Sequence, residues 1–333
     1  MDKIKVGVVG VGHLGRHHVR VYSELPEALL LGVYDIDLKK AKEIASEFNT
    51  SYFEDMNSLL NQTDAVSLVV PTSLHFSVGK KILEKGINLL IEKPITKTVK
   101  QAEKLVSLAR EKNLVLQVGH IERFNPAFKV IEKDKLEPKF IESHRLGPFV
   151  PRGTDVAVIL DLMIHDIDLI LSLVKGRIKK IEACGIPVIT DSEDIANARI
   201  GFENGCVANI TASRISKMPM RKFRIFQKNT YISLDLLEKK AEIFKLVGIE
   251  KIIRKKLKKT PVVGEIPIDA GKTIIYEKPE IEDKDMLSSE IKSFLYSVRN
   301  KTEPKVSGED GKKALEVALE IIKKAKLHRQ RSR

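Results

Sequence analysis

Short apolar segments alternate with amphipathic ones through roughly the first 120 residues, and this rhythm limits the possible folds more than any other feature. The segments with the length and apolar character of buried strands are Ile4–Val9, Leu29–Tyr34, Ala65–Val70, Asn88–Glu92 and Leu114–Gly119. The segments between them with helical spacing are His13–Leu25, Leu38–Phe48, Leu74–Lys85 and Thr98–Asn113. Strands that alternate with helices predict an α/β fold with a parallel sheet covered on both faces.

A glycine-rich segment, Gly10-Val11-Gly12-His13-Leu14-Gly15, joins the first expected strand to the first expected helix. Its spacing fits G-x-G-x-x-G, in which Gly10 permits a tight turn and Gly15 lets helix and strand pack closely. Gly12, followed by His13 and Leu14, would let a pyrophosphate approach the backbone at the helix N-terminus. The segment predicts a dinucleotide site in a Rossmann domain; the alternative is a Rossmann shell that binds no nucleotide.

Asp35 bears on the choice of cofactor. It ends the second expected strand, 20 residues after Gly15, where an acidic side chain binds the adenosine ribose hydroxyls. A carboxylate at this position repels a 2′-phosphate, so NAD is expected and NADP is disfavoured. Lys39 and Lys40 lie nearby in the sequence and could weaken that preference.

After about residue 122 the alternation of strands and helices stops. Ile195–Phe202 and Cys206–Ser213 flank Asn204-Gly205, which is typical of a hairpin turn with positive φ at both central residues. The expected helices of this half are Asp155–Val174, Asp285–Arg299 and Glu309–Leu327. We therefore expect a dinucleotide-binding domain over residues 1–122 and an α+β domain with a largely antiparallel sheet over residues 123–333. The last helix could pack back on the first domain.

The net charge of +13 raises the question of a nucleic-acid partner. Lysines alternate with glutamates along the chain, and only Lys251–Lys259 forms a basic cluster. No nucleic-acid motif accompanies it, so no such partner is expected. The cluster is interpreted as a solvated loop, with attraction of an anionic substrate as the alternative.

The remaining composition is that of an ordinary globular protein, with 43% hydrophobic residues and two cysteines without a paired spacing. Because the cysteines lack a paired spacing, no disulfide is expected. No metal site is expected either, because His, Asp and Glu do not cluster as ligands. The apolar runs are too short to insert in a membrane, and the N-terminal sequence lacks the pattern of a signal peptide. The expected location is the cytoplasm.

Two further motifs carry chemistry. Glu92-Lys93-Pro94 follows an apolar strand, and the carboxyl end of a parallel strand is where ligands of such sheets bind. Glu277-Lys278-Pro279 repeats the tripeptide outside the Rossmann half and is interpreted as a chance copy. Asp161 and His165 are four residues apart on an expected helix, so the carboxylate could orient the imidazole as a general acid or base. The alternative is a helix face that only pairs internally; Asp168 could be either a structural partner or a catalyst.

The order of these motifs resembles the glucose–fructose oxidoreductase/inositol dehydrogenase/MocA family. The resemblance covers essentially the whole chain and implies an NAD-dependent oxidoreductase that acts on a sugar hydroxyl. It also implies a C-terminal domain with an open sheet, a substrate cleft between the domains and a cis-proline after Lys93. Homodimers or homotetramers built through that sheet are implied as well.

Within the family, Gly119–Pro126 and Gly147–Arg152 resemble the subgroup of UDP-N-acetylglucosamine 3-dehydrogenases. This implies oxidation of the 3-hydroxyl to a 3-oxo nucleotide sugar, on a route to 2,3-diamino sugars such as those of lipid A. An inositol or free-sugar dehydrogenase of the same family is the first alternative. A non-catalytic NAD-binding sensor is the second, although it would not need both Lys93 and His165.

The roles of individual residues follow from the resemblance. His165 would take the hydroxyl proton, Lys93 would donate a hydrogen bond to the same oxygen, and Asp161 would hold His165. The side chains expected near the nicotinamide are Pro71, Thr72, His75, Glu92 and Lys93. The candidates for binding the diphosphate or the sugar are Arg123, Asn125, Arg145 and Arg152, because arginine suits bidentate phosphate contacts. Each arginine has a solvated surface position as its alternative.

Overall fold

A computed structural model describes residues 2–132, 135–150, 156–248, 264–269 and 272–331. It contains two compact units. The first unit joins Met1–Phe124 with Lys284–Glu316, and the second joins Asn125–Asp283 with Val317–Arg333. This grouping differs from the expected division at residue 122 because the segment Lys284–Glu316 returns to the first unit.

The first unit is built on a six-stranded parallel sheet in the order β3-β2-β1-β4-β5-β6. Its strands are β1 (Ile4–Val9), β2 (Ala28–Tyr34), β3 (Ser51–Tyr52), β4 (Ala65–Leu68), β5 (Asn88–Glu92) and β6 (Leu116–Gly119). The five expected strands are confirmed to within two residues at each end. The two-residue strand β3 was missed because it is short and exposed and carries no apolar run.

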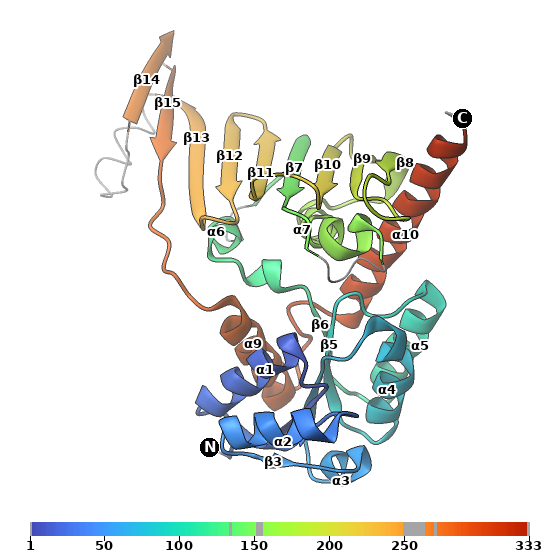
Figure 1. Cartoon of the computed structure of the whole chain (residues 1–333). Helices are drawn as coiled ribbons and strands as arrows, with labels where there is room; N and C mark the ends of the chain where they lie inside the picture. The colour runs from blue at the N-terminus through green and yellow to red at the C-terminus, as the bar shows by residue number, and fades with distance from the viewer. Residues whose placement is uncertain (1, 133–134, 151–155, 249–263, 270–271, 332–333) are drawn as a thin grey trace. The chain divides into compact units, whose positions relative to one another are not determined.

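Helices cover both faces of this sheet. They are α1 (His13–Glu24), α2 (Leu38–Glu47), α3 (Met56–Leu60), α4 (Thr72–Glu84), α5 (Val99–Glu111), α9 (Met286–Asn300) and the start of α10 (Gly308–Arg331). Figure 1 shows α9 beside α1 and α4 beside α5. Phe294 of α9 joins Val6 and Val8 of β1 in one buried core. Helix α9, although late in the sequence, therefore packs in the same layer as α1.

The helix ends follow from local chemistry. Thr98 accepts the backbone N–H of Gln101 through its hydroxyl and caps α5. Gly86 adopts φ +80° directly after α4, a conformation that glycine reaches at low cost. Both positions were expected from the sequence. The apolar strands β1 and β4 are buried between the helical layers, which is the usual environment of a parallel sheet.

The second unit is built on a nine-stranded sheet in the order β14-β15-β13-β12-β11-β7-β10-β9-β8. Its strands are β7 (Phe140–Leu146), β8 (Ile178–Ile186), β9 (Ile195–Phe202), β10 (Val207–Ser213), β11 (Met220–Gln227), β12 (Thr230–Asp235), β13 (Lys240–Gly248), β14 (Gly264–Asp269) and β15 (Lys272–Glu277). All neighbours are antiparallel except β7 and β10, which run parallel. The expected mainly antiparallel sheet is confirmed.

The two faces of this sheet differ in burial. Ile141, Ile225, Ile232 and Ile243 pair across four neighbouring strands and are buried. On the opposite face the rings of Phe140, Phe226, Tyr231, Phe244 and Tyr276 form a row across five strands, with neighbouring centroids 4.7 to 5.5 Å apart. These rings are only half-buried. The isoleucine face is therefore the covered one and the aromatic face is the open one.

The hairpin between β9 and β10 is present, but its expected turn type is wrong at one position. Gly205 has φ +82°, whereas Asn204 is not among the residues with positive φ. The N–H of Gly205 donates to the carbonyl of Phe202 at 3.1 Å. This is the pattern of an ordinary turn followed by one left-handed glycine, which needs positive φ only at Gly205.

The single α-helix expected over Asp155–Val174 is also corrected. The structure has a π-helical turn, η2 (Ile159–Met163), followed by the α-helix α7 (Ile164–Leu173). The backbone just before η2 bonds elsewhere, since Val158 donates to Glu193 and Val156 accepts from Arg214. Asp155 lies outside the described residues.

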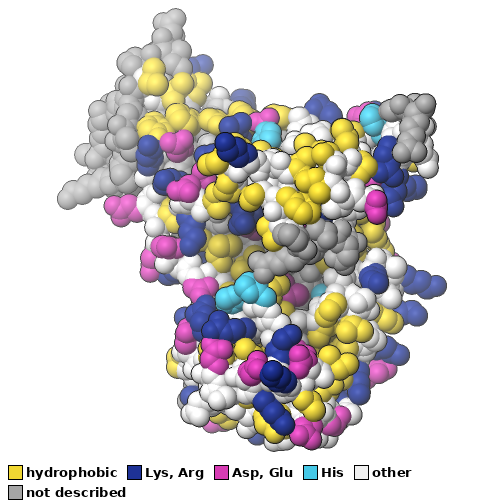
Figure 2. All heavy atoms as spheres, in the orientation of Figure 1, with side chains coloured by type: hydrophobic (Ala, Val, Ile, Leu, Met, Phe, Trp, Pro, Cys, Tyr) yellow, Lys and Arg dark blue, Asp and Glu magenta, His cyan; other side chains and the backbone are white. Residues whose placement is uncertain are grey.

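The next two features are the hydropathy of the helices and the distribution of charged side chains on the surface. Among the described residues, none of the helices is both long and apolar enough to cross a membrane. Figure 2 shows Lys and Arg side chains interspersed with Asp and Glu on the visible face rather than gathered in one patch. The basic cluster Lys251–Lys259 lies outside the described residues.

Candidate active site

The glycine loop between β1 and α1 has the geometry of a phosphate-binding turn. Gly10 has φ +88°, and a Cβ there would lie 2.4 Å from the carbonyl oxygen of Val69. A Cβ on Gly15 would lie 1.9 Å from the carbonyl oxygen of Gly10, so both positions require glycine. A Cβ on Gly12 would meet no described atom within 4 Å. The backbone at Gly12 is therefore open to a ligand.

The N-terminus of α1 is free of competing groups. Among the described residues, no side chain caps it at Gly12, and its first turn contains no acidic residue. The backbone N–H groups and the positive end of the helix dipole are thus available to an anion. His13 and Leu14 in the same turn are exposed. These features fit the pyrophosphate of a dinucleotide.

Asp35 lies at the end of β2 beside this loop. Its Oδ2 accepts the N–H of Val11 at 2.7 Å, and its Oδ1 accepts the N–H of Asp37 at 3.0 Å. An ionised carboxylate has about four acceptor positions, so these two bonds leave capacity for ribose hydroxyls. Ile36, directly after Asp35, is 91% exposed and was not identified from the sequence. An apolar side chain in water next to the acid that is expected to bind the ribose suits the face of an adenine ring.

The Lys93 turn follows the carboxyl end of β5. The Lys93–Pro94 peptide bond is cis, as the family resemblance implied. Oε2 of Glu92 accepts the N–H of Lys93 at 3.3 Å, and Nε2 of His18 lies 3.1 Å from Oε1 of the same carboxylate. The half-buried Lys93 side chain is thereby carried on a turn tied to two neighbouring elements.

His75 holds the same turn from the other side. The ring is fully buried in α4, with Nδ1 2.9 Å from the carbonyl oxygen of Pro94 and Nε2 2.9 Å from that of Val70. Burial lowers the pKa of His75 although the two carbonyl groups oppose this shift. Pro71 and Thr72 start α4 near the surface. His75 therefore lies between two backbone segments, at the end of the sheet where the nicotinamide is expected.

These groups come together because of the strand order. Gly10, Asp35, Pro71 and Lys93 follow the carboxyl ends of β1, β2, β4 and β5, which are consecutive in the sheet order β2-β1-β4-β5. Between β1 and β4 the order reverses, and ligands of open parallel sheets bind at such a point. The first unit thus gathers every residue that was expected to bind the cofactor.

Asp161 and His165 lie in the second unit. Asp161 belongs to the π-helical turn η2 and His165 to the first turn of α7, and both side chains are half-buried. The neighbouring Met163 and Ile164 are buried, so the two polar groups stand at the edge of an apolar region. π-Helical turns inside α-helices occur frequently at functional sites.

Arg145 forms a buried ion pair, and its expected role in binding the substrate stays a prediction. Its Nε donates to Oδ2 of Asp166 at 2.7 Å, and its Nη2 donates to Oδ1 at 3.2 Å. Only 4% of the Arg145 side chain and 2% of the Asp166 side chain are exposed. The pair ties β7 to α7, and an arginine placed on the buried face of a strand needs such a partner.

Asn125 has a structural role, and its expected role in binding the substrate stays a prediction. Its Oδ1 accepts the N–H of Ala127 and caps the short helix α6 (Pro126–Lys129), while its Nδ2 donates to the carbonyl of Leu236. Arg123 is buried in the 3-10 turn η1 (Ile121–Phe124). Arg152 lies outside the described residues.

The second Glu-Lys-Pro copy lies in a different setting. Lys278 follows β15 of the nine-stranded sheet, with its Nζ 5.3 Å from the ring centroid of Tyr276 and 3.5 Å from Oε1 of Glu242. Its side chain is 55% exposed. Lys278 therefore provides a natural control for Lys93.

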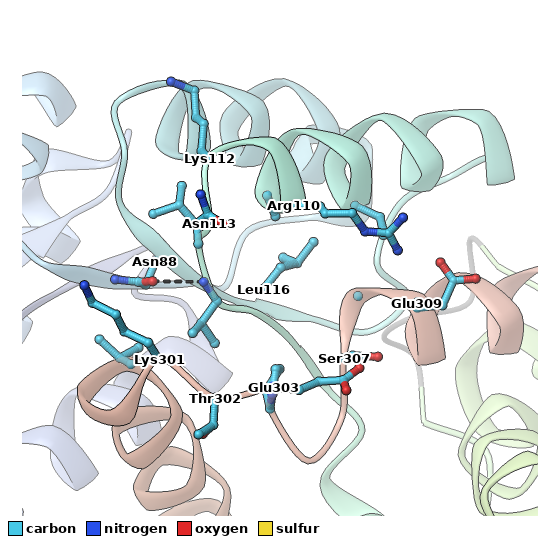
Figure 3. Close-up of a pocket in the computed structure, with 17 residues that line it drawn as sticks. Asn88, Arg110, Lys112, Asn113, Leu116, Lys301, Thr302, Glu303, Ser307 and Glu309 are labelled. Atoms are coloured by element: carbon cyan, nitrogen blue, oxygen red, sulfur yellow. Dashed lines mark hydrogen bonds between the residues drawn. The ribbon is translucent and has the colours of Figure 1, made fainter.

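A cavity of about 950 Å³ opens at the opposite end of the first sheet (Figure 3). Its walls are the start of β5 at Asn88, the turn at Lys112 and Asn113, and the segment that contains Lys301 and Glu303. Figure 3 shows the hydrogen bond between Asn88 and the backbone of Val115 at its base. The cavity lies at the amino ends of β5 and β6, away from the edge where ligands of parallel sheets bind.

Comparison with known proteins decides the family. Residues 4–120 match the model of an oxidoreductase family with an NAD-binding Rossmann fold, and residues 140–232 match the GFO/IDH/MocA C-terminal domain. The UDP-N-acetylglucosamine 3-dehydrogenase of Acidithiobacillus ferrooxidans is 36% identical over 96% of this chain and 97% of its own length. The chain belongs to the GFO/IDH/MocA family of oxidoreductases.

The similarity in structure to a solved relative extends over both units of this chain. A solved structure of the Acidithiobacillus ferrooxidans enzyme matches with a TM-score of 0.87 and covers 97% of this chain and 98% of its own. The myo-inositol 2-dehydrogenase of Thermotoga maritima is 23% identical over 94% of this chain and 93% of its own length. Residues 4–120 are thus the NAD-binding Rossmann fold of a GFO/IDH/MocA oxidoreductase.

Proposed function

We propose that this protein is an NAD⁺-dependent dehydrogenase that oxidises the 3-hydroxyl of UDP-N-acetylglucosamine to a 3-oxo sugar. The observation that carries this proposal is the 36% identity to a UDP-N-acetylglucosamine 3-dehydrogenase, which extends over 96% of the chain. The motifs GHIERFNP and GPFVPR at residues 119–126 and 147–152, which resemble those of the UDP-N-acetylglucosamine 3-dehydrogenase subgroup, support the same substrate. A 2,3-diamino sugar route would be the destination of such a product.

The roles of the chain's own residues follow from their chemistry. NAD⁺, which the Gly10–Gly15 loop and Asp35 would hold, would supply the acceptor for the hydride of the sugar carbon. His165 takes the hydroxyl proton as general base, and Asp161 orients and supports the imidazole. Lys93 donates a hydrogen bond to the same oxygen and stabilises the charge that develops there. The Gly10–Gly15 loop and Asp35 bind the pyrophosphate and the adenosine ribose.

The experiment that tests this proposal is a substrate panel with NAD⁺, followed by the absorbance of NADH. UDP-N-acetylglucosamine should be oxidised with a higher kcat/KM than free N-acetylglucosamine or myo-inositol, and UDP should compete with it. Because inositol dehydrogenases are among the relatives, myo-inositol is the alternative substrate to test. Turnover of inositol with no inhibition by millimolar UDP would replace the nucleotide-sugar assignment with a free-polyol one.

We also propose that NAD⁺ is preferred over NADP⁺. The support is the Asp35 carboxylate, which is fixed beside the glycine loop by its bond to Val11 and would repel a 2′-phosphate. The wild-type enzyme should show a higher kcat/KM with NAD⁺, and Asp35→Ser should narrow the difference. Steady-state kinetics with both cofactors measure this. Equal use of the two by the wild type would contradict the preference.

We further propose that the chain assembles as a homodimer or homotetramer through the open face of the nine-stranded sheet. The row of half-buried rings from Phe140 to Tyr276 supports this, because a contiguous row of partly exposed apolar side chains is typical of an interface. Light scattering of the wild-type protein should give a dimer or tetramer mass. A monomer mass would contradict the assembly.

A further inference from the structure

A buried pair of side chains lies directly behind the Lys93 turn. His18, on the inner face of α1, is 2% exposed, and its Nε2 lies 3.1 Å from Oε1 of Glu92. The other oxygen of this carboxylate, Oε2, accepts the backbone N–H of Lys93. One carboxylate therefore connects α1 to the backbone of the residue that carries the reactive ammonium.

His18 is the donor in this contact. Burial acts to raise the pKa of Glu92, but the His18 hydrogen bond and the positive charge of Lys93 outweigh it and hold the pKa below its ordinary value. An ionised carboxylate can only accept, so Nε2 of His18 must carry a proton. Within the described part of the chain, Nδ1 of His18 has no hydrogen-bond partner. The hydrogen bonding of this ring is thus directed at Glu92.

The Glu92 carboxylate has little room to move. A Cβ on Gly119, at the end of β6, would lie 2.9 Å from the Glu92 carboxyl carbon, so β6 closes one side of the slot. His18 contacts Oε1 of the same carboxylate. The turn itself is also held beyond Lys93, where His75 contacts the carbonyl of Pro94. Loss of the His18 contact would release the one carboxylate that fixes the Lys93 backbone from this side.

We propose that His18 is a positioning residue for the reaction: it holds Glu92, and through Glu92 it fixes the Lys93 turn. This inference rests on the proposed function, in which Lys93 bonds to the reacting hydroxyl. A donor that acts on a transition state must be held within a fraction of an ångström. A displacement of about 1 Å costs on the order of 10²-fold in rate.

Three variants of α1 test the inference. His18→Leu, which removes the donor, should lower kcat about 10- to 100-fold and leave the KM for NAD⁺ nearly unchanged. His18→Gln retains an N–H that can reach Glu92 and should recover most of the lost kcat. Tyr22→Phe is the matched control, because Tyr22 lies one turn further on the same buried face and bonds Ser67 in β4 rather than the turn. Its kcat should equal that of the wild type.

Combination with Lys93→Ala separates a positioning role from a general structural one. If His18 acts through Lys93, the double variant His18→Leu/Lys93→Ala should be no slower than Lys93→Ala alone. Additive losses, wild-type kcat in His18→Leu, or a His18→Gln variant as slow as His18→Leu would each overturn the inference. Wild-type kcat in Lys93→Ala would instead overturn the proposed function, whatever the His18 variants do.

Discussion

Replacement of Lys93 or His165 by alanine should lower kcat by a factor on the order of 10² to 10⁴, the range expected for loss of a positioned hydrogen-bond donor or general base. The KM for NAD⁺ should change little, because neither residue belongs to the glycine loop. Asp161→Asn should fall between wild type and His165→Ala, since it retains the shape but loses the charge that supports a protonated imidazole. Steady-state kinetics on the folded variants measure these effects.

The chain provides the control for this prediction. Lys278 shares the Glu-Lys-Pro context of Lys93, but it lies at the end of β15 against Tyr276 and Glu242. Lys278→Ala should therefore retain wild-type kcat. Near-normal turnover in a folded His165→Ala variant would mean that the Asp161 and His165 pair is structural, and another group would have to take the proton.

Asp194→Ala should destabilise the second unit by about 3–5 kcal/mol, because it leaves a buried guanidinium without its carboxylate. Asp194 is fully buried, and its Oδ1 accepts from Nε of Arg214 at 2.8 Å. Its Oδ2 accepts three consecutive backbone N–H groups, those of Val188, Ile189 and Thr190. This carboxylate therefore organises the whole loop between β8 and β9. Urea unfolding at pH 7 measures the loss of unfolding free energy.

The pH dependence of stability gives the same carboxylate a second signature. Burial would raise the pKa of Asp194, but the backbone N–H groups and Arg214 hold it well below its ordinary value of 3.8. A depressed pKa in the folded state contributes stability that is fully present above pH 3.8 and is lost as the pH falls below it. The difference in unfolding free energy between wild type and Asp194→Ala should therefore decrease as the pH falls below 3.8.

Asp191, which is exposed in the same loop, is the matched control. Asp191→Ala should change the unfolding free energy by less than about 0.5 kcal/mol, as is usual for a surface substitution. An Asp194→Ala variant as stable at pH 7 as Asp191→Ala would contradict the role of the buried carboxylate.

Much of the first unit could be predicted because apolar strands alternate regularly with amphipathic helices along its sequence. Buried parallel strands read as apolar runs, and the rule that ligands bind at their carboxyl ends placed Gly10, Asp35 and Lys93 on one edge of the sheet. Ile36 was missed because a single apolar residue forms no repeating pattern that would distinguish it. The contacts of His18 and His75 were missed because their partners lie 74 and 19 residues away along the chain. Such pairings depend on tertiary packing.

The errors in the second unit have readable causes. β7 was not recognised as a strand, although its burial alternates and places Ile141, Ser143 and Arg145 on one inward face. The ion pair between Arg145 and the buried Asp166 was therefore not foreseen. The Asn125-Pro126 dipeptide is typical of a helix start, with a capping asparagine before a proline at the first helical position. That signal could have identified the cap.

The most direct test of the proposed reaction uses UDP-N-acetylglucosamine deuterated at C3. If the enzyme transfers the C3 hydride to NAD⁺, mass spectrometry of the reduced cofactor should show one deuterium per NADH, and the nucleotide sugar should lose it as a 3-oxo group forms. Reduced cofactor without deuterium would contradict the account. So would a failure of this substrate to reduce NAD⁺ when an inositol reduces it in a parallel reaction.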